Sequence, residues 1–376
     1  MTHEKPVLIL SENLDYHGVA VRWGLQEMEV PFDWWERTEF PRNQLVSSWV
    51  STEDSRIAVS GNDVSLSTDR YRTVWNRRGQ IPQASDALDH TDKVVARNES
   101  IYFLSGLASM LADANPAALF VNAFENAKAA NPKIHQLNVA RSVGFKVPRT
   151  LVSNHPEHIR AFFQHNNGKI VAKQHIPFAW RTTQGALLVT GTAAVSPEHL
   201  VSDEALSACP MIYQEMLSVR NEMRIIAFGR SMFALNQVRT QAPATNGFVD
   251  IRYEKANKHA IAVDEPLAVL CHAYMDMLGL SYAAFDIAQL TDGEYVFLEA
   301  NEAGQFLFLE DQAPELTILD AFCQFLASGD PLFRYEKPTG LKLTAFEKTE
   351  EAKQFQVRYE THMKGSVLTS PFELVE

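Results

Sequence analysis

The sequence has few cysteines and no long hydrophobic run. Its 376 residues include only three cysteines, Cys209, Cys271 and Cys323, which lie far apart and form no C-x-x-C pair. Their spacing argues against a disulfide framework and against a cysteine-based zinc site, and it favours the reducing cytoplasm. No segment approaches the roughly 18 uncharged apolar residues of a membrane helix. We therefore expect a cytoplasmic protein with no membrane partner.

Positive charge is also scarce. The chain has 34 Lys and Arg residues against 46 Asp and Glu residues, which gives a net charge of -12. Such a balance argues against general affinity for nucleic acid or anionic membranes. A hydrophobic content of 46% in a chain of this length is enough for two or three packed units.

The beginning of the chain lacks a dinucleotide-binding fingerprint. Residues 7–10 predict a strand, residues 15–28 a helix and residues 31–35 a second strand, which is typical of an α/β unit. Only a lone Gly18 follows the first strand, where a Rossmann unit would have G-x-G-x-x-G. The unit is therefore α/β without the expected signs of a dinucleotide site.

The most informative segment is a predicted hairpin. Two strand-forming runs, 283–290 and 294–300, flank Thr291-Asp292-Gly293, and Asp-Gly between such runs favours a two-residue loop. With Asp292-Gly293 as that loop, Asp286 pairs with Glu299. Asn301 lies two residues beyond Glu299 and shares its face.

Two facing carboxylates on adjacent strands require a cation or a shared proton. Mg²⁺ fits, because it takes oxygen ligands from one or two carboxylates and from nucleotide phosphates. The alternative is a solvated hairpin face with ordinary surface acids. Apolar neighbours such as Phe297 and Leu298 argue against it, so we expect a metal site at Asp286, Glu299 and Asn301.

Three features upstream of the hairpin could complete a nucleotide site. Lys133 begins a predicted helix, Lys173 ends the predicted strand 170–173, and Glu215 lies in an apolar strand. Each lysine alone is more readily explained as a solvated residue at the end of a helix or strand. A buried Glu215 needs a partner, and the amine of adenine could provide one.

In this order, the features of residues 122–309 resemble the ATP-grasp superfamily. The resemblance implies an α/β ATP-grasp fold with ATP and Mg²⁺ as cofactors. It implies four regions: an N-terminal pre-ATP-grasp α/β domain (1–115), a central lid-bearing subdomain (116–208), a C-terminal antiparallel-sheet subdomain with the hinge and the metal site (209–330), and a tail of unassigned role (331–376).

The resemblance also assigns residues to roles. It implies that the nucleotide is bound by Lys133, Lys173, a phosphate loop with Thr183, Gln184 and Gly185, a hinge of Gln214, Glu215, Met216 and Leu217, and the ribose-binding acid Glu222. Arg224 resembles the arginine that meets the transferred phosphate. Arg239 and Arg252 are expected to bind the carboxylates of an acidic substrate. An equal alternative is that they are surface arginines without a role. The phosphate loop has one glycine where relatives often carry more.

Within the superfamily, further stretches resemble the graspetide synthetases, the microviridin-type maturases of ribosomal peptides. They are VWNRR (74–78), ARNESIYFLSGL (96–107), KIHQLNVARSVGFKVPRT (133–150), Asp250-Ile251-Arg252 and EANEAGQFLFLE (299–310). The resemblance implies a homodimer that forms ω-ester or ω-amide crosslinks in a precursor peptide with a leader and an acidic, Thr-rich core. Two alternatives stay open: an ATP-grasp ligase that acts on small molecules or adds amino acids such as glutamate, and a nucleotide-binding module without turnover.

Overall fold

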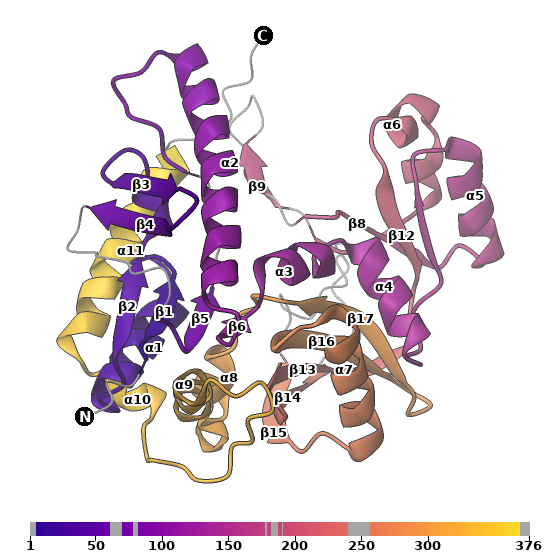
Figure 1. Cartoon of the computed structure of the whole chain (residues 1–376). Helices are drawn as coiled ribbons and strands as arrows, with labels where there is room; N and C mark the ends of the chain where they lie inside the picture. Colours follow the sequence, from indigo (N-terminus) through magenta and orange to yellow (C-terminus); the bar gives the residue numbers. More distant parts are fainter. Residues whose placement is uncertain are drawn as a thin grey trace.

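The structure of the chain is a computed structural model that describes residues 5–60, 70–77, 82–176, 179–181, 187–189, 191–239 and 256–368. Three sheets of four or five strands form its framework, and two short hairpins accompany them. Figure 1 shows the N-terminal sheet on one side, a small lobe around β8 and β12 on the other, and the large sheet of β13–β17 below them.

The N-terminal sheet is parallel, with strand order β2-β1-β5-β6. Its strands are β1 (Val7–Leu10), β2 (Phe32–Trp35), β5 (Thr73–Asn76) and β6 (Leu119–Val121). Both faces are buried, as expected for a parallel sheet. Val7 and Ile9 join the core that contains α1 (Tyr16–Glu27) and α9 (Ile318–Ser328). Leu8 and Leu10 face the core that contains α2 (His90–Ala114).

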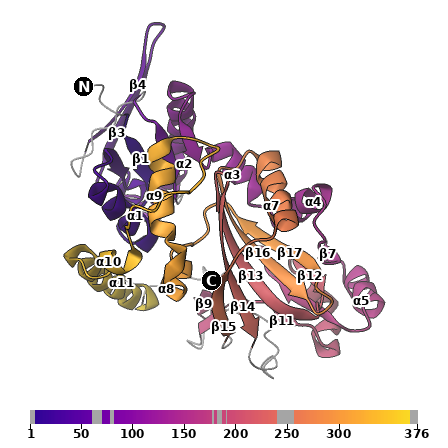
Figure 2. The same ribbon diagram turned by 90° about the horizontal axis from the view of Figure 1, so that it is seen from below.

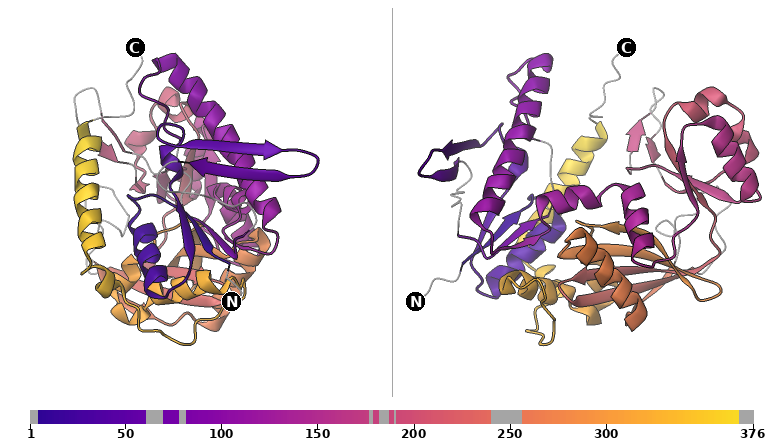
Figure 3. Two further views of the ribbon diagram at one scale, coloured as in Figure 1. Left: turned by 60° about the vertical axis from the view of Figure 1, so that its left-hand side comes forward. Right: turned by 45° about the vertical axis from the view of Figure 1, so that its right-hand side comes forward.

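The hairpin of β3 (Leu45–Val50) and β4 (Ser55–Ser60) projects from this part of the molecule, as Figure 3 shows. A short 3-10 turn at Arg37–Glu39 precedes it.

The small lobe holds an antiparallel sheet with strand order β11-β8-β12-β7. Its elements are β7 (Thr150–Ser153), α5 (Pro156–His165), β8 (Ile170–Lys173), β11 (Ala193–Ala194), a 3-10 turn (Pro197–Leu200), α6 (Asp203–Ser207) and β12 (Met211–Glu215). A separate hairpin joins β9 (Ala179–Arg181) to β10 (Leu187–Val189). One side of the lobe packs through Ile159, Ile170 and Tyr213.

The large sheet is antiparallel and has the order β15-β14-β13-β16-β17. Its strands are β13 (Val219–Phe228), β14 (Ser231–Arg239), β15 (Ala256–Ile261), β16 (Tyr282–Leu290) and β17 (Tyr295–Asn301). One face packs on α4 (Lys133–Ser142) and α7 (Glu265–Leu278), with α3 (Phe124–Ala130) beside them. Figure 2 shows α7 on one side of this sheet and α8 (Phe308–Gln312) with α9 on the other.

The prediction of a two-residue hairpin loop between β16 and β17 is wrong. The N–H of Leu290 donates to the Glu294 carbonyl (2.9 Å), so Thr291, Asp292 and Gly293 form a three-residue loop. Gly293 has a φ of +92°, the positive φ that such loops require near their end. A bulge between Asp286 and Ile287 then shifts the register by one residue. The extra loop residue and the bulge shift the register in opposite directions and cancel. Asp286 therefore pairs with Glu299, as the sequence predicts.

The C-terminal segment, which the sequence leaves unassigned, folds back onto the N-terminal helix. Its elements are α10 (Leu343–Phe346) and α11 (Glu350–Leu368), and a 3-10 turn (Pro314–Leu316) lies before α9, upstream of this segment. The fully buried Phe346 and the nearly buried Phe355 both pack edge-on against Tyr16 of α1, and Arg22 pairs with Glu351. None of the described helices is long and apolar enough to cross a membrane.

Asp320 of α9 anchors this returning segment. Its carboxylate is fully buried and accepts hydrogen bonds from Thr339 N (2.7 Å), Thr339 Oγ1 (2.8 Å) and Tyr335 Oη (3.1 Å). A carboxylate buried in this way needs such donors, because an unpaired buried charge is strongly unfavourable.

We predict that Asp320→Ala lowers the free energy of unfolding by about 3 kcal/mol, because the returning segment loses the buried acceptor of its hydrogen bonds from Thr339 and Tyr335. Urea unfolding monitored by tryptophan fluorescence measures this change. Asp86→Ala is the matched control: Asp86 has a side chain that is 85% exposed and should change stability by less than about 0.5 kcal/mol. Equal losses in the two variants would contradict the anchoring role.

Candidate functional site

One face of the large sheet carries the predicted metal and phosphate residues. Arg224 of β13 pairs with Asp286 of β16, and Asp286 pairs with Glu299 of β17. Glu222 lies two residues before Arg224, and Asn301 two residues after Glu299, so the strand period puts all five on this face. The opposite face is the apolar one that meets α4 and α7.

Lys133 meets Glu299 from the first residue of α4. The two side chains form an ion pair, with exposed fractions of 16% and 23%. The buried amide of Gln136, one turn along α4, donates to the Ala300 carbonyl (2.8 Å) and accepts from its N–H (3.3 Å). Gln136 therefore fixes the start of α4 against β17, which sets the position of Lys133.

The environment of Glu299 keeps its carboxylate ionised. Burial acts to raise the pKa, but the charge and hydrogen bond of Lys133 outweigh it. Lys173 at the end of β8 and the amide of Asn301 lower the pKa further, and the result is about 2. Lys173 belongs to the small lobe and Lys133 to α4. Both predicted phosphate lysines thus stabilise the charge of the same carboxylate, that of Glu299.

Arg224 neutralises the second carboxylate. Its Nη1 donates to both oxygens of Asp286, each at 2.9 Å, and its Nη2 donates to the carbonyl of Gln305 (3.2 Å). The Arg224 side chain is only 10% exposed. Burial lowers the pKa of Arg224, but Asp286 leads the groups that outweigh it and raise the pKa. Arg224 therefore remains a fixed cation on this face.

The loop after β17 is held by residues to which the sequence analysis gave no site role. Gly304 lies so close to Arg224 that a Cβ there would be 2.8 Å from Nη2 and 2.6 Å from the Ala284 Cβ. Arg77, buried at the end of β5, donates to the carbonyls of Ala303 and Gly304 and pairs with Asp15 (3.0 Å). The run VWNRR is the sequence signal for Arg77, but taken alone it favours a strand with an exposed basic end.

Asn122 adds a second tie to the same loop. Its Nδ2 donates to the carbonyls of Glu302 (2.7 Å) and Tyr282 (2.8 Å), and its Oδ1 accepts from the N–H groups of Ser281 and Tyr282. No local sequence signal marks this residue, since its partners lie far along the chain.

The predicted hinge lies where the chain passes from the small lobe to the large sheet. Gln214 is buried and donates to Thr150 Oγ1 (2.9 Å). The partner that Glu215 needs is Arg149, whose N and Nε each donate to the carboxylate at 2.8 Å. Met216 and Leu217 follow β12, and among the residues that the structure describes none forms a hydrogen bond with the backbone of Leu217. Leu217 is therefore the hinge residue with backbone groups open to a ligand.

Several predicted residues lie outside the described residues. These are Thr183, Gln184 and Gly185 of the phosphate loop, and Arg252. Arg239 ends β14, and its side chain is likewise outside the description.

The oxygen donors of the site fit a hard divalent cation. Asp286 and Glu299 each already face a cation, and Asn301 adds an amide oxygen. No group of three or more His, Cys, Asp or Glu side chains suited to a metal occurs in the described part of the chain. A Mg²⁺ ion here would depend on Asn301 and on ligand phosphates as well as the two carboxylates.

We predict that Gly304→Ala destabilises the protein by about 1–3 kcal/mol, because the new methyl group overlaps Arg224 and Ala284. Gly106→Ala is the control, since a Cβ at Gly106, within α2, meets nothing within 4 Å. That change should stabilise the protein by up to about 1 kcal/mol through helix propensity. Urea unfolding checks both signs, and equal stability of the two variants would exclude close packing at Gly304.

The depressed pKa of Glu299 predicts a pH-dependent contribution to stability. A carboxylate with a folded pKa of about 2 against its ordinary value of 4.5 stabilises the fold above pH 4.5, and this contribution is lost as the pH falls toward 2. It amounts to a few kcal/mol at most at pH 7 and is smaller at pH 4. The difference in unfolding free energy between wild type and Glu299→Gln should therefore shrink from pH 7 to pH 4. A constant difference contradicts the pairing with Lys133.

The chain is similar in fold to several proteins of known structure. No family model and no curated protein matches the chain. Among solved structures, the macrocyclase MdnC of Microcystis aeruginosa MRC, bound with precursor peptide MdnA, matches 86% of this chain and 99% of its own at 25% identity and a TM-score of 0.75. The macrocyclase MdnB of the same organism matches with the same coverage at 26% identity and a TM-score of 0.71.

A third solved structure is similar in fold. It is a RiPP-associated ATP-grasp ligase of Chryseobacterium gregarium in complex with ADP and a leader and core peptide. It covers 87% of this chain and 98% of its own, with a TM-score of 0.77 and 22% identity. The expected α/β ATP-grasp fold is confirmed. By fold the chain is a graspetide-synthetase-like ATP-grasp protein, similar to macrocyclases and to a RiPP-associated ATP-grasp ligase.

Proposed function

We propose that this protein is an ATP-dependent peptide ligase that closes ω-ester or ω-amide macrocycles in a ribosomal precursor peptide. The observation that carries the proposal is the pair of facing carboxylates, Asp286 and Glu299, with cations from three elements directed at them. It occurs in a chain whose fold is that of the macrocyclases MdnC and MdnB.

The nucleotide would lie between the small lobe and the large sheet. Lys133 and Lys173 would supply positive charge for its phosphates, and Glu222 would bind the ribose. Gln214 to Leu217 form the adenine hinge, and Thr183, Gln184 and Gly185 the phosphate loop. Asp286, Glu299 and Asn301 would hold Mg²⁺, which neutralises phosphate charge when bound. The ligase PsnB, similar in fold at 23% identity, has been solved with a minimal precursor, Mg and ADP, which supports this reading.

The reaction needs positioned charge and no protein nucleophile. An oxygen of a substrate carboxylate attacks the γ-phosphorus of ATP, and the bond from that phosphorus to the ADP oxygen breaks. A hydroxyl or amine of the same peptide then attacks the acyl carbon, phosphate leaves with the bonding electrons, and the nucleophile loses its proton. Arg224 is placed to stabilise the charge on the transferred group.

The substrate would be a precursor peptide with a leader and a core rich in Thr and acidic residues. Arg239 and Arg252 are our proposals for binding its carboxylates, because a guanidinium pairs with a carboxylate through two hydrogen bonds. We also propose that the protein acts as a homodimer in the cytoplasm. MdnC has been solved with a precursor peptide, which supports a peptide as the substrate.

The test is incubation with ATP, Mg²⁺ and the precursor peptide encoded beside the gene, followed by mass spectrometry and an ADP assay. We expect the peptide to lose one water mass per ring, with one ADP released each time. ADP release without mass loss, or consumption of free amino acids instead of the peptide, would overturn the macrocyclase function.

Variants of the metal residues test the mechanism. Glu299→Gln and Asn301→Ala should lower kcat by at least about a hundredfold without unfolding the protein, because the first removes the negative charge that binds the metal and the second removes an oxygen ligand. Asp292→Asn at the exposed tip of the same hairpin should keep wild-type activity. Full activity of either site variant would refute the metal assignment.

A further inference from the structure

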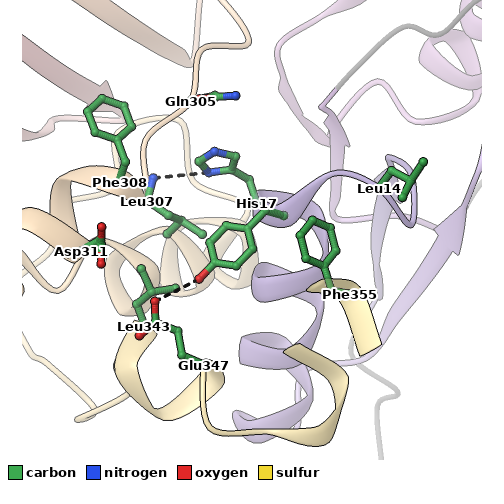
Figure 4. A pocket seen from close by; sticks show the side chains of 10 residues that line it. Leu14, His17, Gln305, Leu307, Phe308, Asp311, Leu343, Glu347 and Phe355 are labelled. Carbon is green, nitrogen blue, oxygen red and sulfur yellow. Dashed lines mark hydrogen bonds between the residues drawn. The ribbon is translucent and has the colours of Figure 1, made fainter. Parts of the chain in front are cut away.

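A pocket of about 370 Å³ lies beside the catalytic face, between the N-terminal helix and the C-terminal segment. Figure 4 shows the side chains that line it. Half of the residues that line it are apolar: Leu14 before α1, Leu307 and Phe308 at α8, Leu343 of α10 and Phe355 of α11. Its volume is at the small end of the range for ligand sites, which suits one or two peptide side chains.

Two carboxylates lie at the edge of this apolar pocket. Asp311 belongs to α8, and Glu347 follows α10; both are exposed. Neither pairs with a basic side chain in the described ranges, and Glu347 only accepts a long hydrogen bond from Tyr16 Oη (3.4 Å). Burial raises the pKa of Tyr16, and the charges of Glu347, Asp311 and Glu310 raise it further. The pocket therefore has a negative potential that would repel phosphate and attract a cation.

The pocket is connected to the catalytic face through one residue. The side chain of Gln305 lines the pocket, while its carbonyl accepts the hydrogen bond from Arg224 Nη2 (3.2 Å). His17, which also lines the pocket, is buried, and its Nδ1 accepts from the N–H of Leu307 (3.3 Å), which fixes the loop in place. Gln305 therefore contacts both Arg224 and the pocket.

We propose that this pocket is a subsite for the peptide substrate, which places an apolar side chain against Leu307 and Leu343 and a neighbouring lysine or arginine beside Asp311 and Glu347. The proposal rests on the proposed function. The apolar walls accommodate the first side chain, and the rim pairs with the cation while its aliphatic stem lies over the apolar surface. The acidic rim repels the phosphates of ATP. The pocket therefore binds the peptide, whereas ATP binds at the separate nucleotide site.

Binding of two matched peptides tests the subsite without turnover. The probes are N-acetyl-Gly-Phe-Lys-Gly-amide and N-acetyl-Gly-Phe-Gln-Gly-amide, titrated in the absence of ATP and followed by saturation-transfer NMR. We expect the lysine peptide to bind wild type about fivefold more tightly at low salt, since two partly solvated ion pairs contribute modestly. The preference should fall as salt is raised.

The double variant Asp311→Asn/Glu347→Gln should bind both peptides equally, whereas the control Glu360→Gln, which changes an exposed acid of α11 outside the pocket, should keep the preference. Equal binding of the two peptides to wild type, survival of the preference in the double variant, or binding of neither peptide at millimolar concentration overturns the subsite.

A separate measurement distinguishes failure of the subsite from failure of the proposed function. ADP affinity should be the same in wild type and in the double variant, because neither changed residue lies at the nucleotide site. With the precursor peptide, the double variant should raise KM and leave kcat near that of wild type. A preference for the lysine peptide without macrocyclisation would support the subsite and refute the proposed function. Macrocyclisation by the double variant with an unchanged KM would support the proposed function and refute the subsite.

Discussion

Repulsion between two facing carboxylates is the constraint on which the rest of the site depends. Asp286 and Glu299 lie directly opposite each other on adjacent strands, where like charges are unfavourable. Arg224 from the neighbouring strand and Lys133 from α4 neutralise them. Gln136 holds α4 in register with β17, and Gly304 leaves the space that Arg224 needs. The packing around the hairpin thus follows from the need to bring cations to it.

The same constraint connects the site to the N-terminal part of the chain. Arg77 is buried at the end of a parallel strand, yet it binds the carbonyls of the loop after β17 and the carboxylate of Asp15. A buried guanidinium requires such partners, because an unpaired buried charge is strongly unfavourable. The loop that carries Gly304 and Gln305 is thereby fixed to the N-terminal sheet, and with it the position of Arg224.

The sequence predicted the local elements well because their signals are local. The strand at 7–10, the start of α4 at Lys133 and the strand at 170–173 follow from residue type and period, and the structure has all three. The pairing of Asp286 with Glu299 was predicted correctly, but the bulge that produces it has no signature in the strand pattern. The roles of Arg77 and Asn122 and the docking of the C-terminal helices depend on partners more than 150 residues away in the chain, which periodicity cannot show.

The return of the C-terminal segment onto α1 also bears on how the protein is made. Tyr16 and Arg22 find Phe346, Phe355 and Glu351 as partners, and α9 supplies much of the core beneath the first strand. On the ribosome, the first α/β unit therefore emerges long before the residues that complete its core. Until residues 318–355 have been synthesised, that unit exposes apolar surface, and the proposed peptide pocket lacks the wall formed by Leu343, Glu347 and Phe355. Assembly of that pocket thus waits for the segment that follows α9 in the chain.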